Sequence, residues 1–267
     1  MHLEVEHLSK TFRLRSGFLG RATPLAAVSD VSLEVPPRGS VAIVGETGSG
    51  KTTVARMVVG LEIPTSGEIL ADGRALPVKP NLSERRERAR LMQMVFQNPF
   101  LSLDARQPVG VGIAEVIRHH GRVEKSKIDA RVSELLDAVG LAERLGRNRP
   151  RQLSGGQCQR AAIARALAAE PEMLVLDEPV SALDVSTQAQ ILNLLADLRE
   201  QFGVGVLMIS HDLAMVRHIS DDVVVMHRGK VVEAGTVEEV LDAPSEPYTQ
   251  QLLAASPERL SLSGAGE

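Results

Sequence analysis

The chain has 267 residues, a formal net charge of −4 and a pI near 6.0, with 43% hydrophobic and 24% charged residues. These values are typical of a globular protein with a sizeable core, and they exclude a fibrous or intrinsically disordered chain. The mildly acidic balance provides no general attraction to nucleic acid or anionic lipid. We therefore expect no nucleic-acid partner, and we expect any membrane contact to be made through a partner protein.

The cysteine count and the first residues predict a cytoplasmic location. Cys158 is the one cysteine, which excludes an internal disulfide and a multi-cysteine metal site, as suits a reducing cytosol. Met1–Glu6 contains two glutamates and no apolar run of the kind found in a signal sequence. No window approaches the roughly 20 apolar residues that a membrane span requires.

The first predicted strands, Leu3–Leu8 and Val31–Val35, alternate apolar and polar residues. This alternation is typical of half-exposed strands near the outer side of a sheet. Three later runs are apolar throughout and favour buried parallel strands: Val41–Val44, Leu174–Leu176 and Val204–Ile209. Helical patterns at 51–60, 186–201 and 212–219 come between or after them, so the chain is predicted to be a wound α/β protein.

Between about Gln107 and Ala169 the strand signals stop, and helical segments such as Lys127–Val139 and Gln157–Ala169 follow one another. We expect a nucleotide-binding core at 1–100 and 170–235, an inserted helical subdomain at 101–169, a helical tail at 236–260 and a flexible end at 261–267. The basic run Ser83–Arg90 mixes both charges, which favours a solvated helix face over a nucleic-acid patch.

A phosphate-binding pattern directly follows the predicted strand Val41–Val44 and opens a helix. Glycines allow backbone N–H groups to converge on a polyphosphate at the positive end of the helix. Lys51 is expected to reach the β- and γ-phosphates, and the Thr52 hydroxyl to bind Mg²⁺. The strand and helix context disfavours a glycine turn without a ligand. The predicted ATP-binding residues are Gly45, Glu46, Thr47, Gly48, Ser49, Gly50, Lys51, Thr52 and Thr53.

Two carboxylates stand where the buried run Met173–Leu176 ends. Asp177 is the candidate Mg²⁺ ligand, and Glu178 is placed to polarise an attacking water. The alternative is that both acids cap the following helix, but Pro179 follows at once.

The segment Leu153-Ser154-Gly155-Gly156-Gln157, ahead of a helix and about 20 residues before Asp177, resembles the signature motif of ATP-binding-cassette (ABC) proteins. A serine, two glycines and a helix N-terminus form a second anion site. The resemblance implies a P-loop, RecA-like α/β core with an N-terminal antiparallel β-subdomain, to which we assign Leu3–Leu8 and Val31–Val35, and an inserted helical subdomain. It also implies that Ser154, Gly155, Gly156 and Gln157 complete the ATP site of a partner subunit in a head-to-tail dimer.

Further elements resemble this family in order along the chain. Gln97 is similar to the glutamine that contacts the metal and the attacking water and responds to the membrane subunit. Asp184, in Ser181–Asp184, is similar to a residue of the dimer interface. His211 is similar to the histidine that contacts the γ-phosphate. His119, His120, His218 and His227 are interpreted as structural.

An aromatic residue early in the chain stacks on adenine in this family, and Phe12 stands at the corresponding position. Phe18 is the alternative, and a core role for Phe12 also stays open.

Three stretches resemble the ATPases of oligopeptide, dipeptide and nickel importers: Phe96–Leu103, Asp177–Ser186 and the tail Pro244–Thr249. The early insertion Arg13–Leu25 resembles the second of two such ATPases, which implies a heterodimer, although a homodimer stays open. The resemblance implies ATP and Mg²⁺, permease subunits and, indirectly, an extracytoplasmic solute-binding protein. It places the chain at the cytoplasmic face of the membrane. Because Cys158 stands alone, we expect no iron–sulfur cluster.

Two rivals remain at this stage, an ABC-type ATPase of phosphonate breakdown and an ABC ATPase that acts without a permease. The loop Asn98–Asp104 bears on the choice, because Phe100, Leu101 and Leu103 are apolar residues among turn-forming ones. We expect this loop and adjoining helices to receive a short permease helix, with burial in the core as the alternative.

Overall fold

The computed structural model describes residues 1–15, 22–120 and 122–255, which divide into two compact units. Unit 1 comprises residues 1–80 together with the chain from Val206 onward, and unit 2 comprises Asn81–Gly205. None of the helices in the described part of the chain combines the length and the hydropathy that a membrane span requires.

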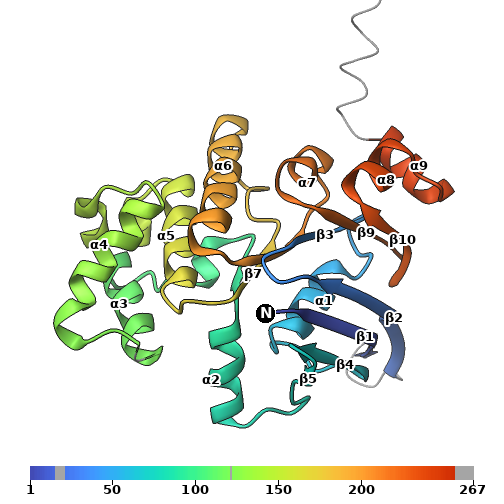
Figure 1. Cartoon of the computed structure of the whole chain (residues 1–267), viewed down its shortest axis with the longest axis horizontal. Helices are drawn as coiled ribbons and strands as arrows, with labels where there is room; N and C mark the ends of the chain where they lie inside the picture. Colours follow the sequence, from blue (N-terminus) through green and yellow to red (C-terminus); the bar gives the residue numbers. More distant parts are fainter. Residues whose placement is uncertain (16–21, 121, 256–267) are drawn as a thin grey trace, which may run out of the picture. The chain divides into compact units, whose positions relative to one another are not determined.

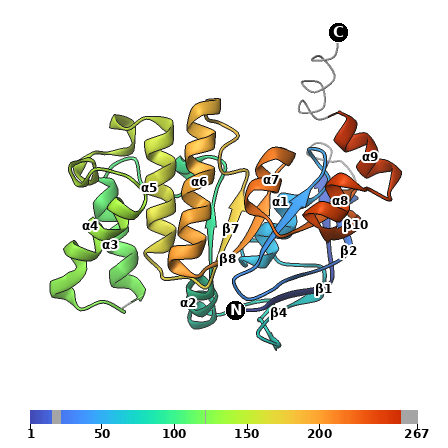
Figure 2. The same ribbon diagram turned by 45° about the horizontal axis from the view of Figure 1, so that its top comes forward.

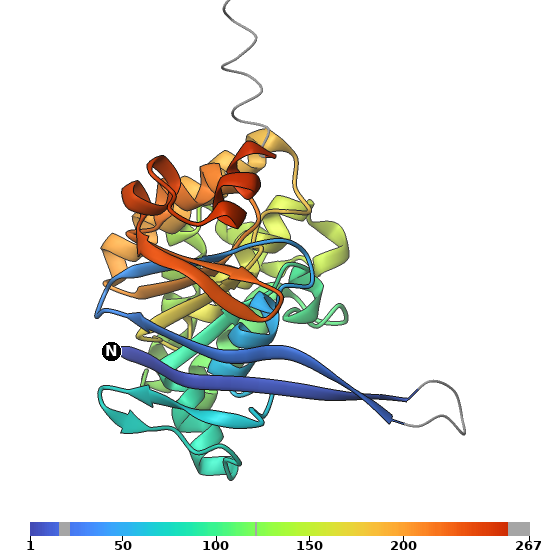
Figure 3. The ribbon, with the colours of Figure 1, turned by 90° about the vertical axis from the view of Figure 1, so that its right-hand side faces the viewer.

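Unit 1 contains an antiparallel sheet with strand order β2-β1-β4-β5. Figure 3 shows its long strands β1 and β2 running side by side as a hairpin. The bounds of the sheet are β1 (Leu3–Arg15), β2 (Ala22–Val35), β4 (Ser66–Ala71) and β5 (Arg74–Ala75). Leu3, Leu8 and Val31 are fully buried, whereas Thr11, Arg13 and the residues from Thr23 to Ala26, farther along the two strands, are exposed. The predicted strands are therefore the buried ends of longer ones.

A second set of strands in unit 1 positions the phosphate loop. β3 (Ser40–Val44) lies between two parallel neighbours, β8 (Gly205–Ile209) and β9 (Asp222–His227), and β9 pairs antiparallel with the edge strand β10 (Lys230–Thr236). β3 and β8 are completely buried, as their continuous apolar runs predict. The helices are α1 (Lys51–Val58), α7 (Leu213–Ile219), α8 (Val237–Asp242) and α9 (Pro247–Ala254).

In unit 2, β6 (Met92–Val95) and β7 (Met173–Asp177) form a parallel pair. Figures 1 and 2 show the long helices of this unit side by side. These are α3 (Val109–His120), α4 (Ile128–Ala138), α5 (Gly155–Leu167) and α6 (Val185–Phe202). Ile113, Leu135 and Ile163 are fully buried between them. Short 3₁₀ turns lie at Pro99–Leu101, Lys125–Lys127, Glu143–Arg147 and Pro150–Gln152.

The predicted charged helix is α2 (Leu82–Leu91), whose N-terminus carries a capping box between Asn81 and Glu84. Most of its residues are exposed, but Arg88 is buried, and desolvation lowers the pKa of its guanidinium. Within the described residues of 107–169 there are helices and turns and no strand, as the sequence predicts.

Candidate nucleotide-hydrolysis site

The phosphate loop of unit 1 follows the carboxyl end of β3, as predicted. The backbone of Gly45 and of Gly50 has φ of 142° and 104°, in the left-handed region that favours glycine. A Cβ at Gly45 would overlap the carbonyl oxygen of Met226, and a Cβ at Gly50 would overlap that of Ala27. Glycine is therefore required at both positions, because neighbouring backbone lies directly against the loop.

Lys51, the first residue of α1, is buried and is held by the loop that precedes it. Its Nζ donates to the carbonyl oxygens of Gly45 at 2.7 Å and Glu46 at 2.8 Å. A buried ammonium group must be compensated by acceptors, so these carbonyls fix the cation at the mouth of the loop. The N-terminus of α1 has no side-chain cap, whereas that of α2 does. The Oγ1 of Thr52 and the backbone N–H groups here suit an anionic ligand.

His211 emerges at the same edge of the sheet as the phosphate loop. β3 and β8 run parallel with Ile43 opposite Ile209, and the N–H of Ser210 donates to the carbonyl of Ile43 at 3.2 Å. His211 is the next residue and is exposed. The carboxyl ends of the two strands thus bring the predicted histidine and the predicted phosphate loop to one edge.

The predicted adenine residue, Phe12, lies in β1 and is half-buried. The ammonium of Lys10 lies 5.0 Å from the centroid of the Phe12 ring, at cation–π distance. Phe18, the alternative, lies outside the described residues.

In unit 2, three polar side chains meet beyond the end of β7. The amide nitrogen Nε2 of Gln97 donates to the Glu178 carboxylate at 3.2 Å and to the Ser181 hydroxyl at 3.0 Å. The Ser181 hydroxyl in turn donates to the Glu178 carbonyl at 3.2 Å. Asp177, one residue earlier, is buried at 6% exposure. The two candidate catalytic residues of this unit, Gln97 and Glu178, are therefore in direct contact. Ser181 contacts both of them, a role that was not predicted from the sequence.

The backbone of Glu178 is strained. Its φ is 47°, in the left-handed region that costs a non-glycine residue on the order of 1 kcal/mol or more. Such strain persists only where the surroundings hold it, and it is concentrated at functional positions.

The signature segment forms the N-terminus of α5. Ser154 and Gln157 build a capping box in which the Ser154 hydroxyl accepts from the Gln157 N–H at 3.3 Å and the Gln157 side chain accepts from the Ser154 N–H at 3.0 Å. Ser154 and Gly155 are exposed. The side chains that the family resemblance assigns to a partner's ATP therefore also cap their own helix.

Asp184 is likewise engaged within its own chain. It caps α6 by accepting from the N–H and hydroxyl of Thr187 and from the hydroxyl of Ser186, at 2.8 to 3.0 Å. The backbone hydrogen bond from Thr187, followed by those two hydroxyls, lowers the pKa of Asp184 to about 2.

A family model described as ABC transporter matches residues 28–181, more than half of the chain. The chain belongs to the ABC transporter family. This membership confirms the predicted fold class and the predicted ATPase activity.

Three curated relatives each align with 96% of the length of this ABC ATPase. The oligopeptide transport ATP-binding protein OppF of Lactococcus lactis is 42% identical over 256 residues, and the aligned part is 80% of that protein. OppD of Mycobacterium bovis, with the same description, is 47% identical over 258 residues, and the glutathione import ATP-binding protein GsiA of Escherichia coli is 44% identical over 256 residues. The chain spans only 42% and 41% of these last two proteins.

Two solved structures share the fold. A dimeric ATP-binding cassette in a post-hydrolysis state, bound to ADP and Pi, has a TM-score of 0.77 and 29% identity, and the match covers 88% of this chain and 98% of that one. The cbiO1 protein of Clostridium perfringens, part of the ABC transporter complex cbiONQ, has a TM-score of 0.77 and 26% identity, with 98% of both chains covered.

Proposed function

We propose that this ABC ATPase hydrolyses ATP to power a peptide importer. Its partners would be permease subunits, a second ABC ATPase in a head-to-tail dimer and, indirectly, an extracytoplasmic solute-binding protein, and it would work at the cytoplasmic face of the membrane. Peptides are favoured because its relatives are named for oligopeptide transport and glutathione import. The observation that carries the proposal is the hydrogen bond between Gln97 and Glu178. Gln97 comes just before the turn Pro99–Leu101, which exposes apolar side chains, so this bond links the candidate catalytic carboxylate to a surface that a partner protein could bind.

ATP and Mg²⁺ fit the residues present. The loop carbonyls already hold the Lys51 ammonium, which would be the cation for the β- and γ-phosphates. Thr52 and Asp177 would supply Mg²⁺ with a hydroxyl and a carboxylate, the hard oxygen donors that this ion prefers. Bound Mg²⁺ neutralises the charge that develops on the phosphates.

The hydrolytic step is assigned to the cluster in unit 2. Glu178 would accept a proton from the attacking water, and the Gln97 amide would orient the carboxylate and that water. His211 would donate to the γ-phosphate. The strained backbone at Glu178 supports this assignment, since strain is retained where geometry matters for function.

The second half of each ATP site would come from the partner. Ser154 and Gly155 are exposed at the start of α5, whose N-terminus favours anions. Asp184 caps the N-terminus of α6 and would face the dimer interface.

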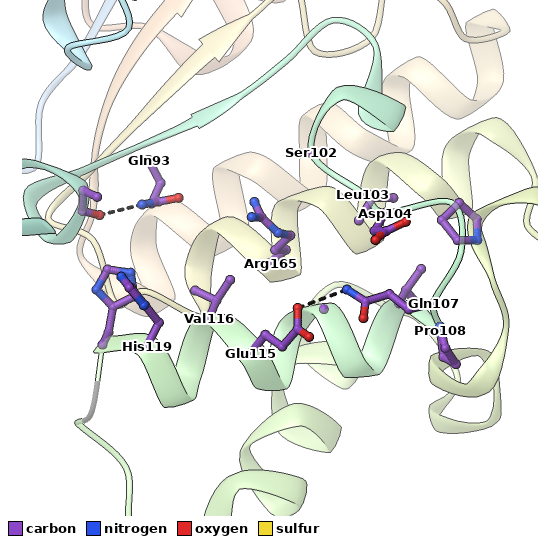
Figure 4. A pocket seen from close by; sticks show the side chains of 15 residues that line it. Gln93, Ser102, Leu103, Asp104, Gln107, Pro108, Glu115, Val116, His119 and Arg165 are labelled. Carbon is purple, nitrogen blue, oxygen red and sulfur yellow. Dashed lines mark hydrogen bonds between the residues drawn. The ribbon is translucent and has the colours of Figure 1, made fainter. Parts of the chain in front are cut away.

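The permease contact is assigned to the turn Pro99–Leu101 and the groove that follows it. Phe100 is 48% exposed and Leu101 is 67% exposed, as a contact with a partner requires. Leu103 is buried, so the alternative of a core role applies to that residue alone among the three. Figure 4 shows the adjoining cavity of about 530 Å³, which Ser102, Leu103, Asp104 and Arg165 help to line. An exposed apolar pair that directly precedes groove-lining residues in the chain fits an amphipathic partner helix.

Substitution at the apolar pair tests this assignment. Phe100→Glu and Leu101→Glu should reduce recovery of the ATPase with purified permease subunits, because a charge would replace buried apolar contact. Leu82→Glu is the matched control, since Leu82 is 76% exposed in α2 of the same unit. Basal ATP hydrolysis by the isolated subunit should be similar in all three variants. Normal assembly of both Phe100→Glu and Leu101→Glu would place the permease contact elsewhere.

A further inference from the structure

The C-terminal tail reaches back to the phosphate loop in unit 1. Its motif Pro244–Thr249 begins after α8, continues into the first residues of α9 and is used by none of the ATP chemistry described so far. The backbone N–H and the hydroxyl of Ser245 both donate to one oxygen of the Glu233 carboxylate at 2.7 Å, and the Gln250 side chain donates to the Pro244 carbonyl at 3.0 Å. These bonds tie the start of α9 to β10.

Tyr248 is the residue that this anchored segment presents to the loop. Its hydroxyl oxygen accepts a hydrogen bond from the backbone N–H of Glu46 at 3.2 Å. Its ring packs against the ring of His227, the last residue of β9, with a centroid separation of 3.9 Å and an interplanar angle of 41°. His227 therefore limits where the Tyr248 ring can lie, and so where its hydroxyl points.

Glu46 connects Tyr248 to Lys51 through the peptide groups on both sides of its Cα. The peptide that contains the Glu46 N–H also contains the Gly45 carbonyl, which accepts from the Lys51 ammonium at 2.7 Å. While the Glu46 N–H donates to Tyr248, the Glu46 carbonyl accepts from the Lys51 ammonium at 2.8 Å and from the Ser49 N–H at 3.2 Å. The turn after β9 holds the other side of the loop, because the Gly229 N–H donates to the Ser49 carbonyl at 2.9 Å.

We propose that Tyr248 is a positioning residue for ATP binding, which fixes the Gly45–Glu46 peptide and through it the Gly45 carbonyl that orients Lys51. It touches no reacting atom. A loop already held in its binding geometry loses less conformational freedom when ATP binds, so the bond favours affinity rather than the chemical step. The expected role is a lower KM for ATP with kcat little affected.

Tyr248→Phe removes the hydroxyl and keeps the ring against His227. ATP binding by the isolated full chain, measured by equilibrium titration with Mg²⁺ present, should weaken roughly 2- to 10-fold, the range expected for one neutral hydrogen bond. KM should rise by the same factor, and kcat at saturating ATP should stay within about twofold. Hydrogen exchange at the Glu46 amide should accelerate, whereas exchange at Val206, which donates to the Gly39 carbonyl in the sheet, should not.

Variants at two further positions, Gln250 and His227, separate positioning of the loop from general loosening of the tail. Gln250→Ala removes a tail hydrogen bond that does not involve the loop, and it should leave ATP affinity and Glu46 exchange at native values. His227→Ala should weaken ATP binding and accelerate Glu46 exchange as Tyr248→Phe does, because it removes the ring contact with Tyr248. His227→Phe keeps an aromatic ring at this position and should restore both to native values. In the double variant with Tyr248→Phe, the His227→Ala effect should not add.

The proposal is overturned if Tyr248→Phe leaves ATP affinity and Glu46 exchange unchanged, or if Gln250→Ala weakens binding as much. Tighter ATP binding by Tyr248→Phe would also overturn it, because the bond would then oppose nucleotide binding. None of these measurements involves a permease or a transported solute, so their outcome is independent of the importer assignment.

Discussion

The signature glycine Gly155 allows the composite ATP site to be tested without disturbing the fold. A Cβ at this position would lie 3.3 Å from a terminal methyl carbon of Leu183, the flexible end of a side chain. Gly155 is also the first residue of α5, where an acidic residue is stabilised by the helix dipole and any side chain improves on the helix propensity of glycine. We therefore expect Gly155→Asp to change the free energy of unfolding by no more than about 0.5 kcal/mol.

The same substitution should disable ATP hydrolysis in the dimer. One carboxylate about 4 Å from one phosphate charge costs on the order of 4 kcal/mol at an effective dielectric constant of 20, which corresponds to roughly a 10³-fold loss. Gly155→Asn is the matched control, because it has nearly the same shape without the charge. Gly156→Ala provides the structural contrast. Its Cβ would lie 2.5 Å from a methyl carbon of Thr187, and such overpacking costs about 1–3 kcal/mol of unfolding free energy.

Complementation is the assay. A Gly155→Asp chain keeps its phosphate loop, and a Lys51→Ala chain keeps its signature segment, so each variant alone should be inactive. In a head-to-tail dimer, mixing them builds one intact site from Lys51 of the first and Gly155 of the second, and hydrolysis should return. Failure of all mixtures to hydrolyse ATP, with mixed dimers present, would refute the head-to-tail arrangement.

Two further outcomes follow from the described contacts. Lys51→Ala should weaken ATP binding roughly 10- to 100-fold, the scale for hydrogen bonds to a charged group, whereas Lys230→Ala, an exposed lysine in β10, should leave the affinity unchanged in the same titration. Asp184 has a folded pKa of about 2 against an ordinary value of 3.8, so its stabilising effect is present above about pH 4 and is lost as the pH falls through 2. Asp184→Ala should lower the thermal midpoint at pH 7, and Asp184→Asn should lower it less, because Asn can still cap the helix but has neither the charge nor the second acceptor oxygen. Near pH 2 the native protein should lose most of its advantage over both variants, which calorimetry at pH 7 and pH 2 would check.

Three of the buried strands could be predicted from the sequence almost residue by residue, whereas β9, which is also buried from Val223 to Met226, was not predicted. Val41–Val44 became β3, Leu174–Leu176 became β7 and Val204–Ile209 became β8, because a strand covered on both faces must be apolar at every position. Strands with exposed faces gave a weaker signal. Leu3–Leu8 is only the first part of β1, and β10 at the sheet edge was not predicted, since its residues are largely half-exposed.

Contacts between distant residues were beyond the reach of pattern analysis. The bond between Gln97 and Glu178 joins residues 81 apart, and the one between Glu46 and Tyr248 joins residues 202 apart. The tail motif resembles that of importer ATPases, but nothing in its spacing indicates that Tyr248 meets the phosphate loop. Likewise, a three-residue 3₁₀ turn has too little periodicity to distinguish exposed Leu101 from buried Leu103. The predicted boundaries of the core, helical subdomain and tail stay predictions.

The central claim is that hydrolysis at Glu178 drives peptide uptake, and ATP-dependent uptake of a labelled peptide into vesicles tests it most directly. The vesicles would contain the permease subunits and the assembled ATPase pair, with this chain either native or Glu178→Gln. Glutamine keeps the size of the side chain and can still pair with Gln97, but it accepts no proton. We expect the variant to bind ATP and to assemble, while uptake falls roughly 10²- to 10⁴-fold. Uptake at the native rate by assembled Glu178→Gln would contradict the account.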